Sequence, residues 1–181
     1  MAISLDDASV LLSSALTSSK GFHTTSITRL SLRGSQLLRS CTPHLYFTLP
    51  AQLFADPYEL DHRRAFYTFQ RFGGGDLEAP VFAAGADGPS GLLLDLAVPE
   101  GGDDEGVLSI EVPLHARYGV PKTEGEPIDE ILLPPPEAFW ACVQEGAVGG
   151  GGGGASYVFL HASGTNGNLG SHNVLFFFSR E

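Results

Sequence analysis

The chain has 181 residues, 43% of them hydrophobic and 17% charged, which suits one folded domain of ordinary size and argues against global disorder. Its net charge is −11, and thirteen of its 21 acidic residues lie between positions 76 and 130. Nucleic acids and anionic membrane surfaces select for clusters of Lys and Arg, so this charge disfavours both as partners. The 23 glycines and 12 prolines predict many turns and few long helices.

The first segment, residues 1–20, is predicted to form a short peripheral helix followed by a serine-rich linker. Apolar residues recur at near-helical spacing between Leu5 and Leu16. Asp6 and Asp7 precede this apolar patch and no basic residue leads it, so the segment does not have the pattern of a signal peptide.

Alternating or compact apolar runs predict short strands along the rest of the chain. We expect strands at residues 28–33, 44–49, 66–72, 92–98, 107–114, 128–133 and 139–143. Short strands separated by frequent turns are typical of a β-sandwich. The sequence therefore predicts a mainly β fold, an antiparallel two-layer β-sandwich with one or two short helices.

The strongest local signal is a helix start at Asp56, Pro57 and Glu59. Asp56 suits the N-cap position, and Pro57 suits the first helical position, where its missing N–H costs nothing. Glu59 is placed to reach back and close a capping box. A helix is therefore predicted from residue 57 to about residue 64, and capping alone accounts for both carboxylates.

No arrangement of residues in the sequence indicates an active site or a metal centre. There is no Gly-x-Ser-x-Gly elbow, and the glycine tracts lack the Gly-Lys-Ser/Thr of a phosphate loop. The six histidines form no close pair at metal-ligand spacing. A nucleophilic pair of Cys142 with a remote histidine is a guess that almost any chain with these residues would allow. We expect no enzyme, no catalytic or metal-binding residue and no cofactor.

Three motifs together resemble the PIG-X family. They are Leu-Pro-x-x-Leu-Phe-x-Asp-Pro-Tyr-Glu-Leu at 49–60, Leu-Glu-Ala-Pro at 77–80 and Pro-Leu-His-Ala-Arg-Tyr-Gly-Val-Pro at 113–121. Gly-Phe-His at 21–23 stands in the place of the family's leading His-containing segment. The motifs occur in family order over about residues 21–142, and the first of them is specific by itself.

Members of this family are the small, non-catalytic subunits of glycosylphosphatidylinositol (GPI) mannosyltransferase I. The resemblance implies that this chain binds and stabilises the catalytic subunit, PIG-M, which adds the first mannose to the GPI precursor. It also implies a place on the luminal side of the endoplasmic reticulum membrane. Family members end in a transmembrane helix, whereas this sequence has no run of 18 apolar residues. Membrane association is therefore expected through the partner or through a missing transmembrane helix.

The resemblance also marks candidate residues for partner contact or for specifying the fold. These are Asp56, Pro57, Tyr58, Glu59, Leu60, Glu78, Pro80, His115, Arg117 and Tyr118. Strand periodicity should place the side chains of His115 and Arg117 on one face at the surface, where arginine and tyrosine are common interface anchors. The same residues could equally form an ordinary solvated strand face.

The family also shows cysteine at the places of Cys41 and Cys142, and an oxidising lumen would allow a disulfide between them. Two buried thiols are the alternative, because sequence does not give connectivity. We expect the PIG-X-like luminal β domain to cover residues 21–146. Six glycines at 149–154 indicate that folded structure fades in a divergent tail over residues 147–181.

Two other functions fit the sequence without the resemblance. One is a free-standing β-sandwich module that binds a glycan or a protein. The other is a hydrolase whose active site has no recognisable motif.

Overall fold

A computed structural model describes most of the chain between residues 9 and 162. The described residues are 9–18, 20–33, 41–73, 76–77, 79–84, 88–98, 105–119, 130–143 and 157–162. Their strands are β1 (Ser9–Leu16), β2 (His23–Arg33), β3 (Cys41–Leu49), β4 (Leu53–Phe54), β5 (Tyr67–Phe72), β6 (Ser90–Leu96), β7 (Glu105–Ala116), β8 (Glu137–Val143) and β9 (Tyr157–Ala162). Their helices are α2 (Pro57–Asp61) and α3 (Val81–Ala84).

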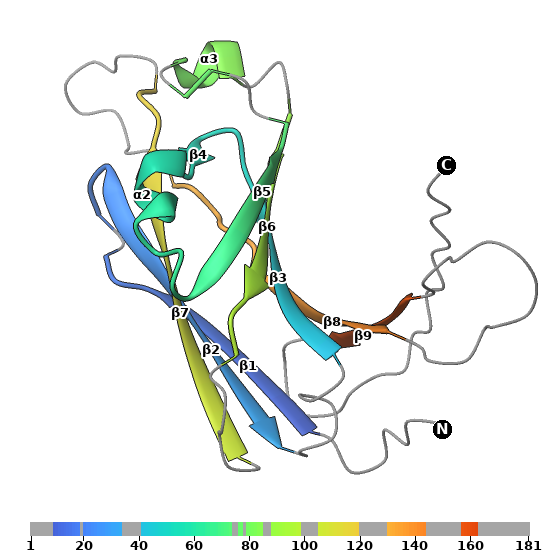
Figure 1. Ribbon diagram of the computed structural model, residues 1–181. Coiled ribbons are helices and arrows are strands. Elements are labelled where there is room, and N and C mark those ends of the chain that lie inside the picture. The colour runs from blue at the N-terminus through green and yellow to red at the C-terminus, as the bar shows by residue number, and fades with distance from the viewer. Residues whose placement is uncertain are drawn as a thin grey trace, which may run out of the picture.

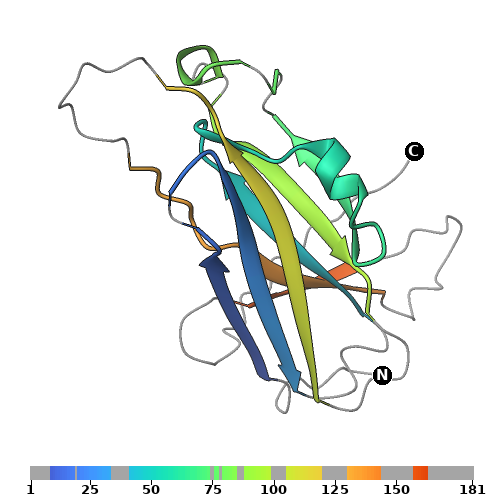
Figure 2. The same cartoon turned by 90° about the vertical axis from the view of Figure 1, so that its left-hand side faces the viewer.

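The strands form two antiparallel sheets, in the orders β1-β2-β7-β4 and β5-β6-β3-β8-β9. Figure 2 shows the two layers, with β1, β2 and β7 in front of β3 and β6. The predicted two-layer β-sandwich is confirmed.

The core lies between the sheets and is built from alternate residues of the strands. On β3 the inward residues Leu45, Phe47 and Leu49 are buried, and the residues between them are not. Strand β7 buries Ile110, Val112 and Leu114 from the other layer, as its alternation predicts. Other large buried side chains come from the neighbouring strands, namely Leu30, Leu60, Tyr67, Leu92, Leu94 and Trp140.

The predicted N-terminal helix is wrong, because residues 9–16 form the edge strand β1. This strand pairs with β2 over its whole length, from Ser9 opposite Arg33 to Leu16 opposite Ser26. The Ser14 hydroxyl lies 3.2 Å from those of both Ser26 and Thr28, which ties the side chains of the two strands together. Pairing with β2 outweighs the weak local preference for a helix, since differences in helix propensity are worth only tenths of a kcal/mol per residue.

Two segments in the second half of the chain differ from the strands expected there. Within the predicted tail, Tyr157–Ala162 forms β9 and pairs with β8. Residues 130–133 belong to no strand, although a strand is predicted at 128–133. Three prolines follow at 134–136, and proline has no N–H group to donate to a ladder. The rest of the predicted tail, apart from β9, lies outside the described residues.

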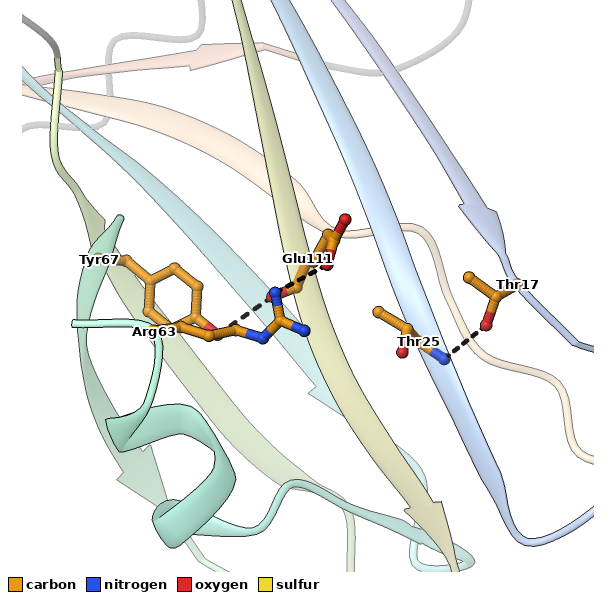
Figure 3. A network of polar contacts seen from close by, with 5 residues as sticks. All are labelled: Thr17, Thr25, Arg63, Tyr67 and Glu111. Atoms are coloured by element: carbon orange, nitrogen blue, oxygen red, sulfur yellow. Dashed lines mark hydrogen bonds and ion pairs between the residues drawn. The ribbon is translucent and has the colours of Figure 1, made fainter. Parts of the chain in front are cut away.

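Helix α2 closes one side of the sandwich, where the chain passes from β4 in one sheet to β5 in the other (Figure 1). Leu60 projects from α2 into the core and is fully buried. Just after α2, Arg63 Nη1 donates to Glu111 Oε2 on β7 at 2.7 Å. The Tyr67 hydroxyl donates to the Glu111 carbonyl oxygen at 3.1 Å (Figure 3). These contacts join the two sheets. Elsewhere, Thr25 N donates a hydrogen bond to Thr17 Oγ1, which joins the end of β1 to β2.

The two cysteines lie opposite one another on β3 and β8. The Cα atoms of Cys41 and Cys142 are register partners, and Cys41 is disulfide-bonded. The chain contains two cysteines, so Cys142 is the one other cysteine in the chain that can pair with Cys41. We propose that a Cys41–Cys142 disulfide fixes the pairing of β3 with β8.

Tyr67→Phe should make the free energy of unfolding less dependent on pH under alkaline conditions. Burial raises the pKa of Tyr67 from 10.0 to about 12, with Arg63 opposing this and Glu111 adding to it. Above about pH 10 the unfolded chain loses the phenol proton and the folded chain keeps it. The free energy of unfolding should therefore fall between about pH 10 and 12, by on the order of 1 kcal/mol per pH unit. Urea unfolding of wild type and variant across this range measures the difference. Tyr58→Phe is the control, since Tyr58 is 77% exposed; equal slopes in wild type and Tyr67→Phe would contradict the account.

Cys41→Ser should destabilise the domain under non-reducing conditions. The bridge would close a loop of about 100 residues, worth on the order of 4 kcal/mol by chain entropy. Thermal or urea unfolding with and without reductant provides the measurement. Reductant should lower wild-type stability to that of Cys41→Ser and leave the variant unchanged, and an insensitive wild type would count against the bridge.

Candidate functional site

The first motif builds β4 and α2 and divides into buried and exposed residues. Asp56 caps α2, because its Oδ1 accepts a hydrogen bond from Tyr58 N at 2.9 Å, and Pro57 follows at the first helical position. Leu60 is fully buried, whereas Tyr58 points outward with 77% of its surface exposed. The predicted helix start is confirmed, although α2 ends at Asp61 rather than near residue 64.

Glu59 contacts another motif instead of closing a capping box, so that part of the prediction is wrong. Its Oε2 lies 3.0 Å from His115 Nε2 on β7. The His115 ring also stacks on Phe54, with centroids 5.1 Å apart, and meets the His23 ring edge-on at 4.6 Å. A single imidazole thus holds α2, β4 and β2 against the end of β7.

Arg117 binds the second motif to the other motifs. Its Nη1 lies 2.8, 2.8 and 2.9 Å from the carbonyl oxygens of Asp76, Leu77 and Ala79. Its guanidinium carbon lies 4.9 Å from the centre of the Phe54 ring, in a cation–π contact. Arg117 is only 8% exposed, so the expectation that its guanidinium lies at the surface is wrong.

Burial is the largest influence on the pKa of the Arg117 guanidinium. Desolvation lowers the pKa of the guanidinium, Asp76 opposes this, and Arg71 adds to it. An arginine pKa begins so high that the group keeps its proton at physiological pH. Arg117 therefore carries a buried positive charge, and its hydrogen bonds to described residues go to neutral carbonyl groups.

Two aromatic rings beside this buried centre remain open to solvent. The rings of Phe22 and Tyr118 have centroids 5.0 Å apart and are 52% and 72% exposed. Their backbones are fixed, because Ala116 N donates to Phe22 O at 2.8 Å and Val81 N donates to Tyr118 O at 3.1 Å. We call these two rings the aromatic rim.

The aromatic rim and neighbouring residues line an open pocket of about 450 Å³. Its lining consists of Phe22, His23, Phe54, Leu77, Ala79, His115, Ala116, Arg117 and Tyr118. These residues come from all four sequence segments that carry the family resemblance. We call the cluster of His23, Phe54, His115 and Arg117, in which Arg117 is the buried member, the motif junction.

The remaining candidate residues lie near the junction or outside the described part of the chain. Pro80 precedes α3 and is partly buried, and its carbonyl oxygen accepts from Ala83 N at 2.9 Å. Glu78 lies outside the described residues. Sequence reasoning gave no role to Phe22 or Phe54, because their contacts are with residues far away in the chain. The one signal in the sequence that points to Phe22 and Phe54 is their position within the motif segments 21–23 and 49–60.

Neither a metal centre nor a membrane span is found within the described ranges. No group of three or more His, Cys, Asp or Glu side chains there is placed to hold a metal ion. No described helix is both long enough and apolar enough to cross a bilayer.

The fold and the junction define a class of all-β sandwich domain in which dispersed motifs meet at one end of the molecule. The chain belongs to the PIG-X / PBN1 family, whose family model matches residues 19–159. It is 37% identical over 151 residues to the protein PBN1 of Gibberella zeae, covering 77% of this chain and 29% of that relative.

Other relatives match shorter parts of the chain. The protein pbn1 of Neurospora crassa is 38% identical over 112 residues, which are 58% of this chain and 21% of that protein. The protein pbn1 of Emericella nidulans is 35% identical over 115 residues, which are 59% and 21% of the two chains. This chain thus spans less than a third of the length of the curated relatives it matches. No solved structure matches it.

Arg117→Met should destabilise the domain by about 3 kcal/mol, because it leaves three carbonyl groups without their donor. Urea unfolding measures this loss. Arg64→Met is the matched control, since Arg64 forms an exposed ion pair with Asp61 and its side chain is 71% exposed. Removing such a pair should cost less than about 1 kcal/mol, and similar losses in the two variants would show that Arg117 does not hold the junction.

Proposed function

We propose that this chain is a non-catalytic subunit in GPI-anchor biosynthesis that binds and stabilises PIG-M, the catalytic mannosyltransferase that adds the first mannose. Membership of the PIG-X / PBN1 family supports this role. The supporting observation from the structure is that the family's motif segments meet in one junction with an exposed aromatic rim.

The chemistry of the junction favours binding over catalysis. Catalysis by His115 or Glu59 would require one of them to act on a substrate, yet each is paired with the other at 3.0 Å. Arg117 Nη1 is occupied by three carbonyl groups. The polar groups of the motifs therefore hold chain segments together, and the groups left open to a partner are mainly aromatic.

This division gives the candidate residues two kinds of role in the proposal. Asp56, Pro57, Leu60, His115 and Arg117 would act through the fold, because their contacts are internal. Tyr58 and Tyr118 would contact the partner directly, since both rings are more than 70% exposed. Tyrosine is among the residue types that most often dominate binding energy at interfaces.

The proposed location is the luminal side of the endoplasmic reticulum, with membrane association through the partner. A disulfide-bonded Cys41 fits an oxidising compartment, where such bonds form and persist. The acidic composition fits a surface that does not adhere to anionic lipid headgroups.

Expression of the chain in cells that lack their own PIG-X / PBN1 protein tests this function. Wild type should co-purify with PIG-M and raise its steady-state level and the amount of GPI-anchored protein at the cell surface. Tyr58→Ala should reduce co-purification at unchanged melting temperature. Asp56→Ala should lose about 1 kcal/mol of stability through the missing cap, and co-purify only in proportion to the folded fraction.

Either of two results would contradict the proposal. One is a PIG-M level that does not depend on the chain. The other is loss of co-purification in Asp56→Ala without any loss of stability, which would make Asp56 a contact residue instead of a cap.

A further inference from the structure

In the described part of the chain, β1 is an edge strand that lacks the usual protection of a sheet edge. It is the longest of the four edge strands of the two sheets, and it pairs on one side only, with β2 (Figure 2). Its residues include no charged side chain and no proline, and its register with β2 runs one to one without a bulge. Folded proteins usually protect an exposed edge by one of these devices or by keeping the strand short. We call the side of β1 that faces away from β2 the open edge.

The backbone hydrogen bonds of the sheet show which groups of β1 face the open edge. Just past the end of β1, Thr17 N donates to Thr25 O at 2.9 Å, and hydrogen-bonded positions alternate along an antiparallel pair. The odd-numbered residues of β1 therefore bond to β2. On the other side of β2, the 2.8 Å bond from Ala116 N to Phe22 O fits the same alternation. The N–H and C=O groups that point to the open edge belong to the even-numbered residues Val10, Leu12, Ser14 and Leu16.

The side chains beside the open edge present an apolar face and a positive charge. On the inward face, Leu12 packs against the core and Leu16 is 42% exposed. On the outward face, Arg29 of β2 lies opposite the short side chain of Ser13. Arg29 is exposed and forms no ion pair with a described residue. A strand added at the open edge would lie about 10 Å from β2, two strand spacings away, and an acidic side chain on it can meet Arg29 above Ser13.

We propose that the open edge binds an extended segment of the partner subunit as a further antiparallel strand, with an Asp or Glu of that segment paired with Arg29. The backbone groups of the even-numbered residues supply most of the affinity, as in other complexes formed by strand addition. The pair with Arg29 selects the register, because opposite charges on neighbouring strands attract one another. This inference rests on the proposed function, because it names how the partner subunit is held.

A second copy of this chain fits the open edge less well. None of the four described edge strands contains Asp or Glu, so none of them could supply the acid that Arg29 lacks. A second copy would also bring a second net charge of −11, which opposes self-association. A separate segment with an acidic residue among alternating apolar residues supplies both the backbone groups and the missing charge.

Synthetic peptides added to the full chain test the pairing directly. The probe is acetyl-Thr-Val-Thr-Val-Glu-Val-Thr-Val-Thr-amide with the two threonines nearest to the glutamate N-methylated. With the valines facing inward, these methyl groups lie on the side away from β1, where they also prevent the peptide from stacking on itself. The dissociation constant should be on the order of 0.1 mM. The matched control carries the methyl groups on the two valines next to the glutamate. It should bind at least about tenfold more weakly, because those N–H groups would donate to β1.

Amide hydrogen exchange of the full chain, followed by nuclear magnetic resonance, shows where the probe binds. In the free chain the amides of Leu12, Ser14 and Leu16 should exchange quickly, and those of Ser13 and Ala15 slowly. A saturating amount of the probe should slow the first group by about tenfold or more, because these amides then donate to the added strand. This alternation is specific to pairing at the edge, since binding to a face of the sheet would not protect every second residue.

Two pairs of variants separate the backbone pairing from the charge. Ser14→Pro removes an N–H that faces the open edge and places the proline ring there, which an edge strand tolerates. Ser14→Ala is its control, because both variants lose the hydroxyl group that lies 3.2 Å from those of Ser26 and Thr28. At equal melting temperatures, Ser14→Pro should bind the probe about tenfold more weakly than Ser14→Ala. Arg29→Gln should weaken binding about threefold and should bind a probe with Gln in place of Glu equally well. Arg64→Gln, which removes an exposed charge from the segment after α2, should bind as wild type does.

Several results would overturn the proposal. They are equal binding of the two methylated peptides, equal binding by Ser14→Pro and Ser14→Ala, and slow exchange of the Leu12 and Ser14 amides in the free chain at low concentration. Equal effects of Arg29→Gln and Arg64→Gln would remove the acidic residue from the partner segment and leave that part of the proposal wrong. Protection of the same amides that rises with protein concentration, without a peptide, would assign a second copy of the chain as occupant.

Co-purification with PIG-M distinguishes failure of this inference from failure of the proposed function. If wild type does not co-purify, the proposed function fails whatever the peptides show. If wild type co-purifies, Ser14→Pro should be retained severalfold less than Ser14→Ala. Equal retention of the two variants would overturn the assignment of the open edge alone.

Discussion

The buried guanidinium of Arg117 is the contact on which the arrangement of the motif-bearing end of the sandwich depends. It brings three carbonyl groups of residues 76–79 to the end of β7 and lies over Phe54 of the neighbouring edge strand β4. Carbonyl groups in a connecting segment otherwise need water or secondary structure to satisfy them. At residues 76–79 the Arg117 side chain takes the place of the hydrogen bonds that a neighbouring strand would make. This explains how a segment outside the sheets keeps a fixed position beside the aromatic rim.

His115 complements Arg117 from two positions earlier on the same strand. Its contacts reach the helix through Glu59 and the neighbouring strand through His23. Because a strand places residues two apart on the same face, both side chains meet Phe54, which therefore serves as a common support. The four motif segments, which are dispersed in the sequence of this chain, thus meet in one local structure.

Much of the fold could be predicted from sequence because its causes are local. The period of two in β3 and β7 marks their inward residues, and the cap at Asp56 involves neighbours within a few positions. What was missed depends on distant partners. β1 is a strand only because β2 lies beside it, and Glu59 leaves its own helix only because His115 is near. At the site, resemblance selected the residues, but burial of Arg117 and exposure of Phe22 follow from packing that no short window contains.

The sheet order has a consequence for the time at which the domain can form. β2 pairs with β7 and β3 pairs with β8, so each early strand has a partner that is synthesised much later. Such non-local pairing gives high contact order, and loop-closure entropy is lost before the contacts that reward it are made. During translation β2 therefore lacks this neighbour until residue 116 has been synthesised, and β3 lacks its neighbour until residue 143 has been synthesised. Unpaired strand edges promote aggregation, so this strand order makes the domain most vulnerable to aggregation while it is being synthesised.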